Sequence, residues 1–201
     1  MTYATLDDLA HHLEELRGYD PDYFTRMMHK VPHVPVVDRA AFLVEQCRGK
    51  RVLHLGCAGP LHQLLKPVCT ALYGVDRGPQ PMEHYYDVDL DEHPENLPTG
   101  IFLDWVLMGE VLEHLGNPGR LLATVRLKYT CPVIISVPNA FARAGAGALQ
   151  KGYEQVNLEH VAWYSWRTLT TLVERYGYTV DRWYWYNGQP LTAEGLIVEA
   201  H

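Results

Sequence analysis

The sequence lacks any apolar run that approaches the ~20 residues of a membrane-spanning helix. It also lacks clustered Lys and Arg: the net charge is −7, and no basic run offers a patch for a phosphate backbone. Its four cysteines include no CxxC pair of the kind found in zinc or redox sites. These absences exclude membrane insertion and argue against long nucleic acid as a partner.

The first twenty residues are acidic and carry no basic start followed by an apolar stretch, so we expect no secretory signal. Together with the isolated cysteines, this predicts a protein of the reducing cytoplasm. At 201 residues the chain has the length of one ordinary domain. Residues 5–17 show a leucine stripe of helical period, and residues 21–48 indicate further helices. We therefore predict an N-terminal helical cap over 1–48 and a compact domain over 49–201.

Short apolar runs alternate with helical patterns beyond residue 50. Strands are predicted at 51–55, 70–75, 102–108, 132–137, 178–186 and 195–200, with a weak further strand before Asp87. Helices are predicted at 60–67, 110–115, 118–128 and 166–176, and the Ala/Gly stretch 142–148 is predicted to be a mobile loop. This order is typical of an α/β fold with a doubly wound, mostly parallel seven-stranded sheet whose last strand is antiparallel.

A short turn with two glycines follows the first predicted strand. In the run 52–60 (VLHLGCAGP), Gly56 and Gly59 stand between apolar residues and a helix. Glycine lets the backbone approach a ligand closely, and the N–H groups at the start of the helix point to the same place. Such turns also need glycine for steric reasons alone, so the turn by itself leaves a binding role open.

Two carboxylates lie at the expected edge of the sheet. Asp76 ends the second predicted strand, where it can accept hydrogen bonds from both hydroxyls of a ribose or cap a helix. Asp87 follows the weak third strand, where it can accept a hydrogen bond from an adenine amino group or lie in a solvated acidic loop. Combined with the glycine turn, these carboxylates predict a nucleotide site.

Five motifs in this order resemble those of class I S-adenosylmethionine-dependent methyltransferases, which have a Rossmann-like fold. They are the segments 52–60, 74–76, 104–122, 133–141 and 157–172. The last two are similar to the branch that includes ubiquinone-type O-methyltransferases and glycan-cluster methyltransferases. The resemblance implies S-adenosylmethionine as cofactor, with its methyl group facing Met108, Gly109 and Glu110. The cofactor-binding residues that it implies are His54, Gly56, Cys57, Ala58, Gly59, Asp76, Asp87, Met108 and Gly109.

Three positions depart from the family pattern. His54 replaces the usual acidic residue, Ala58 replaces a second glycine, and Pro60 stands near a further glycine position. A missing carboxylate removes one usual anchor of the cofactor, and proline gives up an N–H in the first helical turn. A cofactor-binding but inactive partner subunit therefore stays an alternative to an enzyme.

A second group of polar residues follows the fourth-strand motif. Glu110, Glu113 and His114 have the spacing i, i+3 and i+4, which predicts that they share one helix face, and His160 follows the fifth strand. Two carboxylates and two imidazoles can bind Mg²⁺ or Mn²⁺. The set resembles the metal site of small-RNA 3′-end 2′-O-methyltransferases. The alternatives are packing roles, or His114 or His160 as a general base without metal.

The sequence predicts an O-methyltransferase that acts on a hydroxyl of a small-molecule or glycan-type acceptor, with His114, His160 and Glu110 as catalytic residues. An N-methyltransferase or a small-RNA end-modifying enzyme is the alternative, although the acidic charge speaks against RNA. Trp163 and Tyr164 stand beside His160, where aromatic faces suit a sugar or a planar ring. The oligomeric state cannot be read from the sequence.

Overall fold

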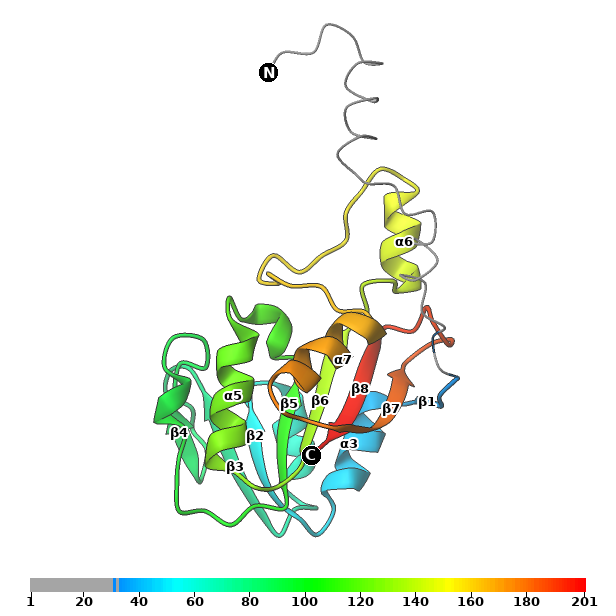
Figure 1. Ribbon diagram of the computed structural model, residues 1–201. Coiled ribbons are helices and arrows are strands. Elements are labelled where there is room, and N and C mark those ends of the chain that lie inside the picture. Colours follow the sequence, from blue (N-terminus) through cyan, green and yellow to red (C-terminus); the bar gives the residue numbers. More distant parts are fainter. Residues whose placement is uncertain (1–30, 32) are drawn as a thin grey trace, which may run out of the picture. The chain divides into compact units, whose positions relative to one another are not determined.

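The computed structural model describes residue 31 and residues 33–201, which form one sheet flanked by helices (Figure 1). The strands are β1 (Val36–Val37), β2 (Arg51–Leu55), β3 (Ala71–Asp76), β4 (Tyr85–Asp87), β5 (Trp105–Gly109), β6 (Val133–Pro138), β7 (Val180–Tyr186) and β8 (Gly195–Ala200). The helices are α3 (Arg39–Cys47), α4 (Pro60–Leu65), α5 (Pro118–Lys128), α6 (Arg143–Leu149) and α7 (Trp166–Arg175), with short 3₁₀ turns η1 (Pro94–Asn96) and η2 (Leu112–His114).

The strands pair in the order β1-β7-β8-β6-β5-β2-β3-β4. All neighbours are parallel except β8, which runs antiparallel to both β6 and β7. This confirms the predicted α/β class with a mostly parallel sheet and an antiparallel last strand. The sequence did not predict β1, which adds an eighth strand of two residues at one edge.

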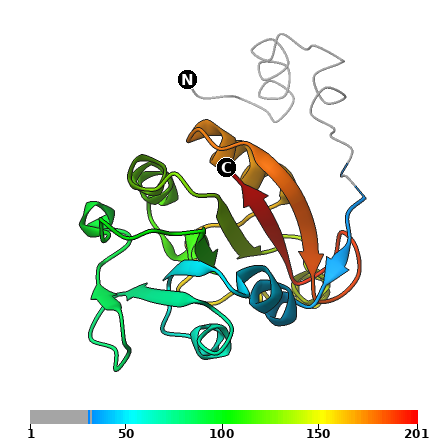
Figure 2. The ribbon, with the colours of Figure 1, turned by 90° about the horizontal axis from the view of Figure 1, so that it is seen from below.

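Both faces of the sheet are covered, with α5 and α7 on one side and α3 and α4 on the other (Figure 2). Alternate residues of a strand pack into the two apolar clusters on opposite faces of the sheet. Leu53 packs in the core beneath α5 and α7, whereas Val52 packs with Leu43 of α3 and Leu65 of α4. Because side chains of a strand alternate between faces, a strand covered on both sides becomes apolar throughout. This explains why β2, β5 and β6 were visible in the sequence as continuous apolar runs.

Three predicted elements differ from the structure. The strand predicted at 102–108 begins only at Trp105, because Asp104 instead accepts hydrogen bonds from the main chain and guanidinium of Arg51. The helix predicted at 110–115 is the 3₁₀ turn η2, and Glu110 lies outside it with a positive φ of 59°. The Ala/Gly stretch predicted to be a mobile loop contains the helix α6, none of whose residues is buried.

Only part of the segment 1–48, for which we predict a helical cap, is described. There, β1 pairs with β7 and α3 packs on the sheet. The predicted helix at 5–17 lies outside the described residues. In the part of the chain that the structure describes, no helix is both long and apolar enough to cross a membrane.

Candidate cofactor and acceptor site

The glycine turn between β2 and α4 forms one wall of a cavity of about 1000 Å³ at the carboxyl edge of the parallel strands. Gly56 has a φ of +73°, and a side chain there would collide with Val111. Its N–H donates to the carbonyl of Val75 (2.9 Å), which joins the turn to β3. Only glycine combines this backbone conformation with so close an approach, so the turn is fixed before any ligand arrives.

Asp76 connects the end of β3 to this turn. Its Oδ2 accepts a hydrogen bond from the N–H of Ala58 (2.7 Å), and its Oδ1 accepts one from the N–H of Arg77 (2.8 Å). The carboxylate also lines the cavity. Because each carboxylate oxygen has two acceptor sites, Asp76 can hold the turn and still bind two ligand hydroxyls.

The structure brings most, but not all, of the predicted cofactor residues to the cavity. The ones that line it are His54, Gly56, Ala58, Gly59, Asp76 and Gly109. Cys57 and Met108 are fully buried, and Asp87 is exposed and accepts a hydrogen bond from the N–H of Gly78 (2.8 Å). None of these three is among the described residues that line the cavity. Asp89, which the sequence analysis did not select, lines it instead.

His54 carries no charge at the position where the family pattern has an acid. It is buried in β2, and its Nδ1 lies 3.3 Å from Nδ1 of His62 on α4. Burial, with the nearby His62 and Arg39, lowers the pKa of His54 to about 3. Burial likewise lowers the pKa of His62. A neutral His54 imidazole therefore lies in the cavity wall, within hydrogen-bonding distance of His62 behind it.

Arg39, at the start of α3, is a cavity residue that sequence reasoning missed. Its Nε donates to Oγ of Ser136 (3.1 Å), and its Nη1 lies 3.6 Å from Oε2 of Glu110. The guanidinium also lies over the ring of Tyr186, 5.7 Å from the centroid. The sequence does indicate the start of α3, because Asp38 is a preferred N-cap residue. Nothing in this signal shows that the side chain of Arg39 contacts strands about a hundred residues further along the chain.

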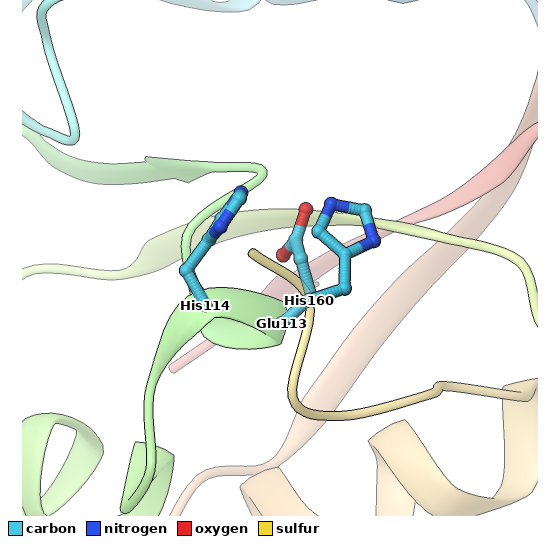
Figure 3. Close-up of side chains that lie close together, drawn as sticks. All are labelled: Glu113, His114 and His160. Carbon is cyan, nitrogen blue, oxygen red and sulfur yellow. The ribbon is translucent and has the colours of Figure 1, made fainter. Parts of the chain in front are cut away.

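Glu113, His114 and His160 lie close together (Figure 3), and all three line the cavity. One ligand atom of each residue lies within 4.8 Å of the others. The loop that carries His160 is joined to η2 by the N–H of Val161, which donates to the carbonyl of Glu113 (2.8 Å). The rings of His114 and His160 meet edge to face, 4.7 Å between centroids.

Glu110 does not belong to this group, which corrects the prediction of a four-residue metal site. The prediction assumed a helix that begins at residue 110, but the positive φ of Glu110 turns its side chain out of the helical series. Its Oε1 instead accepts a hydrogen bond from the hydroxyl of Tyr186 (2.6 Å). Three of the four predicted ligands are therefore brought together.

The Glu113 carboxylate is a buried acid without a partner. It is 1% exposed, and neither oxygen accepts a hydrogen bond within the described part of the chain. Burial raises its pKa to about 8, and the charge of Glu110 adds to the shift. Burial and the neighbouring His114 lower the pKa of His160. A buried carboxylate beside two imidazoles fits the needs of a divalent cation, which compensates the buried charge and can be coordinated by all three side chains.

The segment between β6 and α7 also contributes to the cavity wall. Its ends are joined because the N–H of Ala140 donates to the carbonyl of Tyr164 (2.7 Å). Between them lie α6 and the loop whose residues Asn157, Glu159 and His160 line the cavity. Trp163 is half-exposed and Tyr164 is buried, and neither is among the described cavity residues.

Solved structures that are similar to this chain include S-adenosylmethionine-dependent methyltransferases. One from Archaeoglobus fulgidus has a TM-score of 0.62 at 19% identity, covering 81% of this chain and 90% of that one. The small RNA methyltransferase HEN1 has a TM-score of 0.64 at 16% identity, covering 87% of this chain but 27% of its own. The N-methyltransferase NodS from Bradyrhizobium japonicum, solved with S-adenosyl-L-homocysteine, has a TM-score of 0.56 at 17% identity, covering 81% and 84%.

The sheet order, the glycine turn and the acid at the end of β3 give this chain the fold of S-adenosylmethionine-dependent methyltransferases. A family model described as a methyltransferase domain matches residues 24–182. The chain belongs to this methyltransferase domain family. No curated protein sequence matches it.

Proposed function

We propose that this methyltransferase transfers the methyl group of S-adenosylmethionine to a hydroxyl of a small-molecule or glycan-type acceptor. The observation that carries the proposal is the cluster of Glu113, His114 and His160, which faces the same cavity as the glycine turn. A hydroxyl is a weak nucleophile that must lose a proton, and this cluster contributes imidazole side chains that can assist that loss.

Each end of the cavity has a separate task in this proposal. At the nucleotide end, Asp76 binds the ribose hydroxyls, and Asp89 takes the adenine-side position that the sequence predicts for Asp87. At the other end, Asn157 and Glu159 are hydrogen-bonding partners for acceptor hydroxyls. Methyl transfer depends mainly on holding the acceptor oxygen in line with the methyl carbon and the sulfur, which two sites in one cavity achieve.

The reaction needs a proton acceptor but no covalent intermediate. The acceptor oxygen bonds to the methyl carbon as the carbon–sulfur bond breaks, sulfur keeps the electron pair, and the hydroxyl proton passes to water or, in the metal-free alternative, to the imidazole of His160. Glu113, His114 and His160 would hold a Mg²⁺ or Mn²⁺ ion, which when bound lowers the pKa of a hydroxyl. The residues of this chain then orient the acceptor and exclude water around the buried Glu113.

Paired acceptors test the choice of a hydroxyl over an amine. Compounds that share one skeleton and differ only in a hydroxyl or an amino group are offered with radiolabelled cofactor. The hydroxyl member of a pair is expected to be methylated at least about tenfold faster, because a cation held by the cluster would bind a hydroxyl oxygen and would repel an aliphatic amine, which is protonated at neutral pH. Preferential labelling of the amines would contradict O-methylation and favour N-methylation, while leaving the methyltransferase class intact.

A further inference from the structure

The segment between β6 and α7 concentrates exposed apolar side chains. Among the described residues, twelve large apolar side chains are exposed, and six of these lie within residues 141–163. The six are Phe141, Leu149, Tyr153, Leu158, Val161 and Trp163. Their exposed fractions range from 47% for Trp163 to 98% for Leu158. Single exposed apolar residues are common, but a group of this density in one segment indicates a contact surface.

Helix α6, within this segment, gains little from the rest of the described domain. It lies beyond the strand ends, apart from α5 and α7, and none of its residues is buried (Figure 1). A Cβ at Gly145 or Gly147 would meet no described atom within 4 Å, so close packing does not require either glycine. Glycine weakens a helix relative to alanine, and a helix of seven residues is too short to be stable in water by itself. Such a helix is suited to contact with a surface outside the domain.

Charge and composition indicate the kind of surface. The net charge of the chain is −7, yet residues 141–153 contain the exposed Arg143 and Lys151 and no acidic residue. Basic residues beside leucine and aromatic side chains are typical of segments that lie at a lipid–water interface. The groove of a partner protein instead selects one apolar helix face. Here the apolar side chains are spread over α6 and the irregular chain that follows it.

We propose that residues 141–163 bind the surface of a lipid bilayer that contains anionic lipids. The leucine and aromatic side chains enter the headgroup region, which demands no complementary shape, and Arg143 and Lys151 pair with lipid phosphates. Binding of this kind needs no membrane-spanning helix. The same segment carries Asn157 and His160, which line the cavity, so binding brings this wall of the cavity to the lipid.

Sedimentation with vesicles tests the proposal on the full chain. The protein is expected to bind vesicles of phosphatidylcholine mixed with phosphatidylglycerol at least about tenfold more tightly than phosphatidylcholine alone, because two basic side chains gain from anionic headgroups. The double variant Leu149→Ser/Leu158→Ser is expected to bind the mixed vesicles about tenfold more weakly or worse, because exposed apolar area is lost. Arg143→Gln with Lys151→Gln is expected to remove most of the preference for phosphatidylglycerol.

The controls separate lipid contact from other causes. Leu127→Ser removes a leucine of similar exposure from α5 and is expected to leave vesicle binding unchanged. Binding of S-adenosylhomocysteine, measured without vesicles, shows that each variant is folded. Binding to neither kind of vesicle, or unchanged binding in the double leucine variant, would overturn the proposal. A dimer that forms without vesicles and is lost in that variant, with no vesicle binding, would also overturn it and assign the surface to a second copy of the chain.

Discussion

Replacing Glu113 with glutamine is expected to lower methyl transfer by about 10²- to 10⁴-fold, the range that a positioned acid–base group contributes. Glutamine has nearly the same shape but no charge, so it cannot hold a cation with His114 and His160. Calorimetric titration with Mn²⁺ should show binding in the wild type and none in Glu113→Gln. Affinity for S-adenosylhomocysteine should not change, because Glu113 lies at the acceptor end. Glu174→Gln, which alters an exposed carboxylate on α7, is the matched control.

Chelation should reproduce the effect of this substitution on the wild type. Activity is expected to disappear when divalent ions are removed and to return when Mg²⁺ or Mn²⁺ is added. An imidazole base without metal gives a different result: the chelator has no effect, and the rate follows an ionisation that is lost in His160→Ala. Full activity in metal-stripped protein would therefore exclude the ion and leave the methyltransferase class unaffected.

The same substitution should stabilise the metal-free protein at alkaline pH. The pKa of Glu113 is about 8 in the folded chain against 4.5 for an ordinary glutamate, so ionisation opposes folding. Below pH 4.5 the wild type and the glutamine variant are therefore expected to be about equally stable. As the pH rises from there through about 8, the free energy of unfolding of the wild type falls relative to that of the variant. The difference reaches on the order of 3–5 kcal/mol. In thermal unfolding, this corresponds to a gain of roughly 5–15 °C for Glu113→Gln near pH 9 and none near pH 4.

Asp76→Ala is expected to weaken binding of S-adenosylmethionine and S-adenosylhomocysteine by roughly 1–3 kcal/mol, or about 5- to 150-fold. Two contacts are lost at once: the proposed bonds to the ribose hydroxyls, and the bond from the N–H of Ala58 that holds the glycine turn. Isothermal calorimetry measures the change directly.

Asp76→Asn separates these two contributions. The amide oxygen can still accept from Ala58, so the turn keeps its support, while the charge is lost. The asparagine variant should fall between the wild type and Asp76→Ala. Asp87→Ala should have a smaller effect than Asp76→Ala, because Asp87 is turned toward the N–H of Gly78. Unchanged affinity in Asp76→Ala would remove Asp76 from the cofactor site.

The sheet was predictable because its strands are apolar on both faces and its turns contain glycine and aspartate at the strand ends. Leu53, Val106 and Ile135 are fully buried, and residue types of this kind predict burial from the sequence alone. β1 could not be predicted in this way, since it has only two residues and lies at an edge of the sheet.

The site was only partly predictable because its contacts join distant parts of the chain. Spacing predicted that Glu113 and His114 lie close together, as they do, but it grouped Glu110 with them, since no pattern of residues signals a positive φ at a glutamate. Arg39 bonds to Ser136 across 97 residues, and its neighbours carry no motif that indicates this contact. Long-range side-chain pairing is a product of packing, which local periodicity does not encode.

The hydrogen bond between Ala140 and Tyr164 has a consequence for the evolution and engineering of acceptor choice. It holds together the two ends of the intervening segment, which contains α6 and His160, beside the end of β6. A segment whose two ends are held together can change in length and composition at little entropic cost to the rest of the fold. Exchanging residues 141–159 between relatives is therefore a route to new acceptors that keeps the cofactor site and His160 intact.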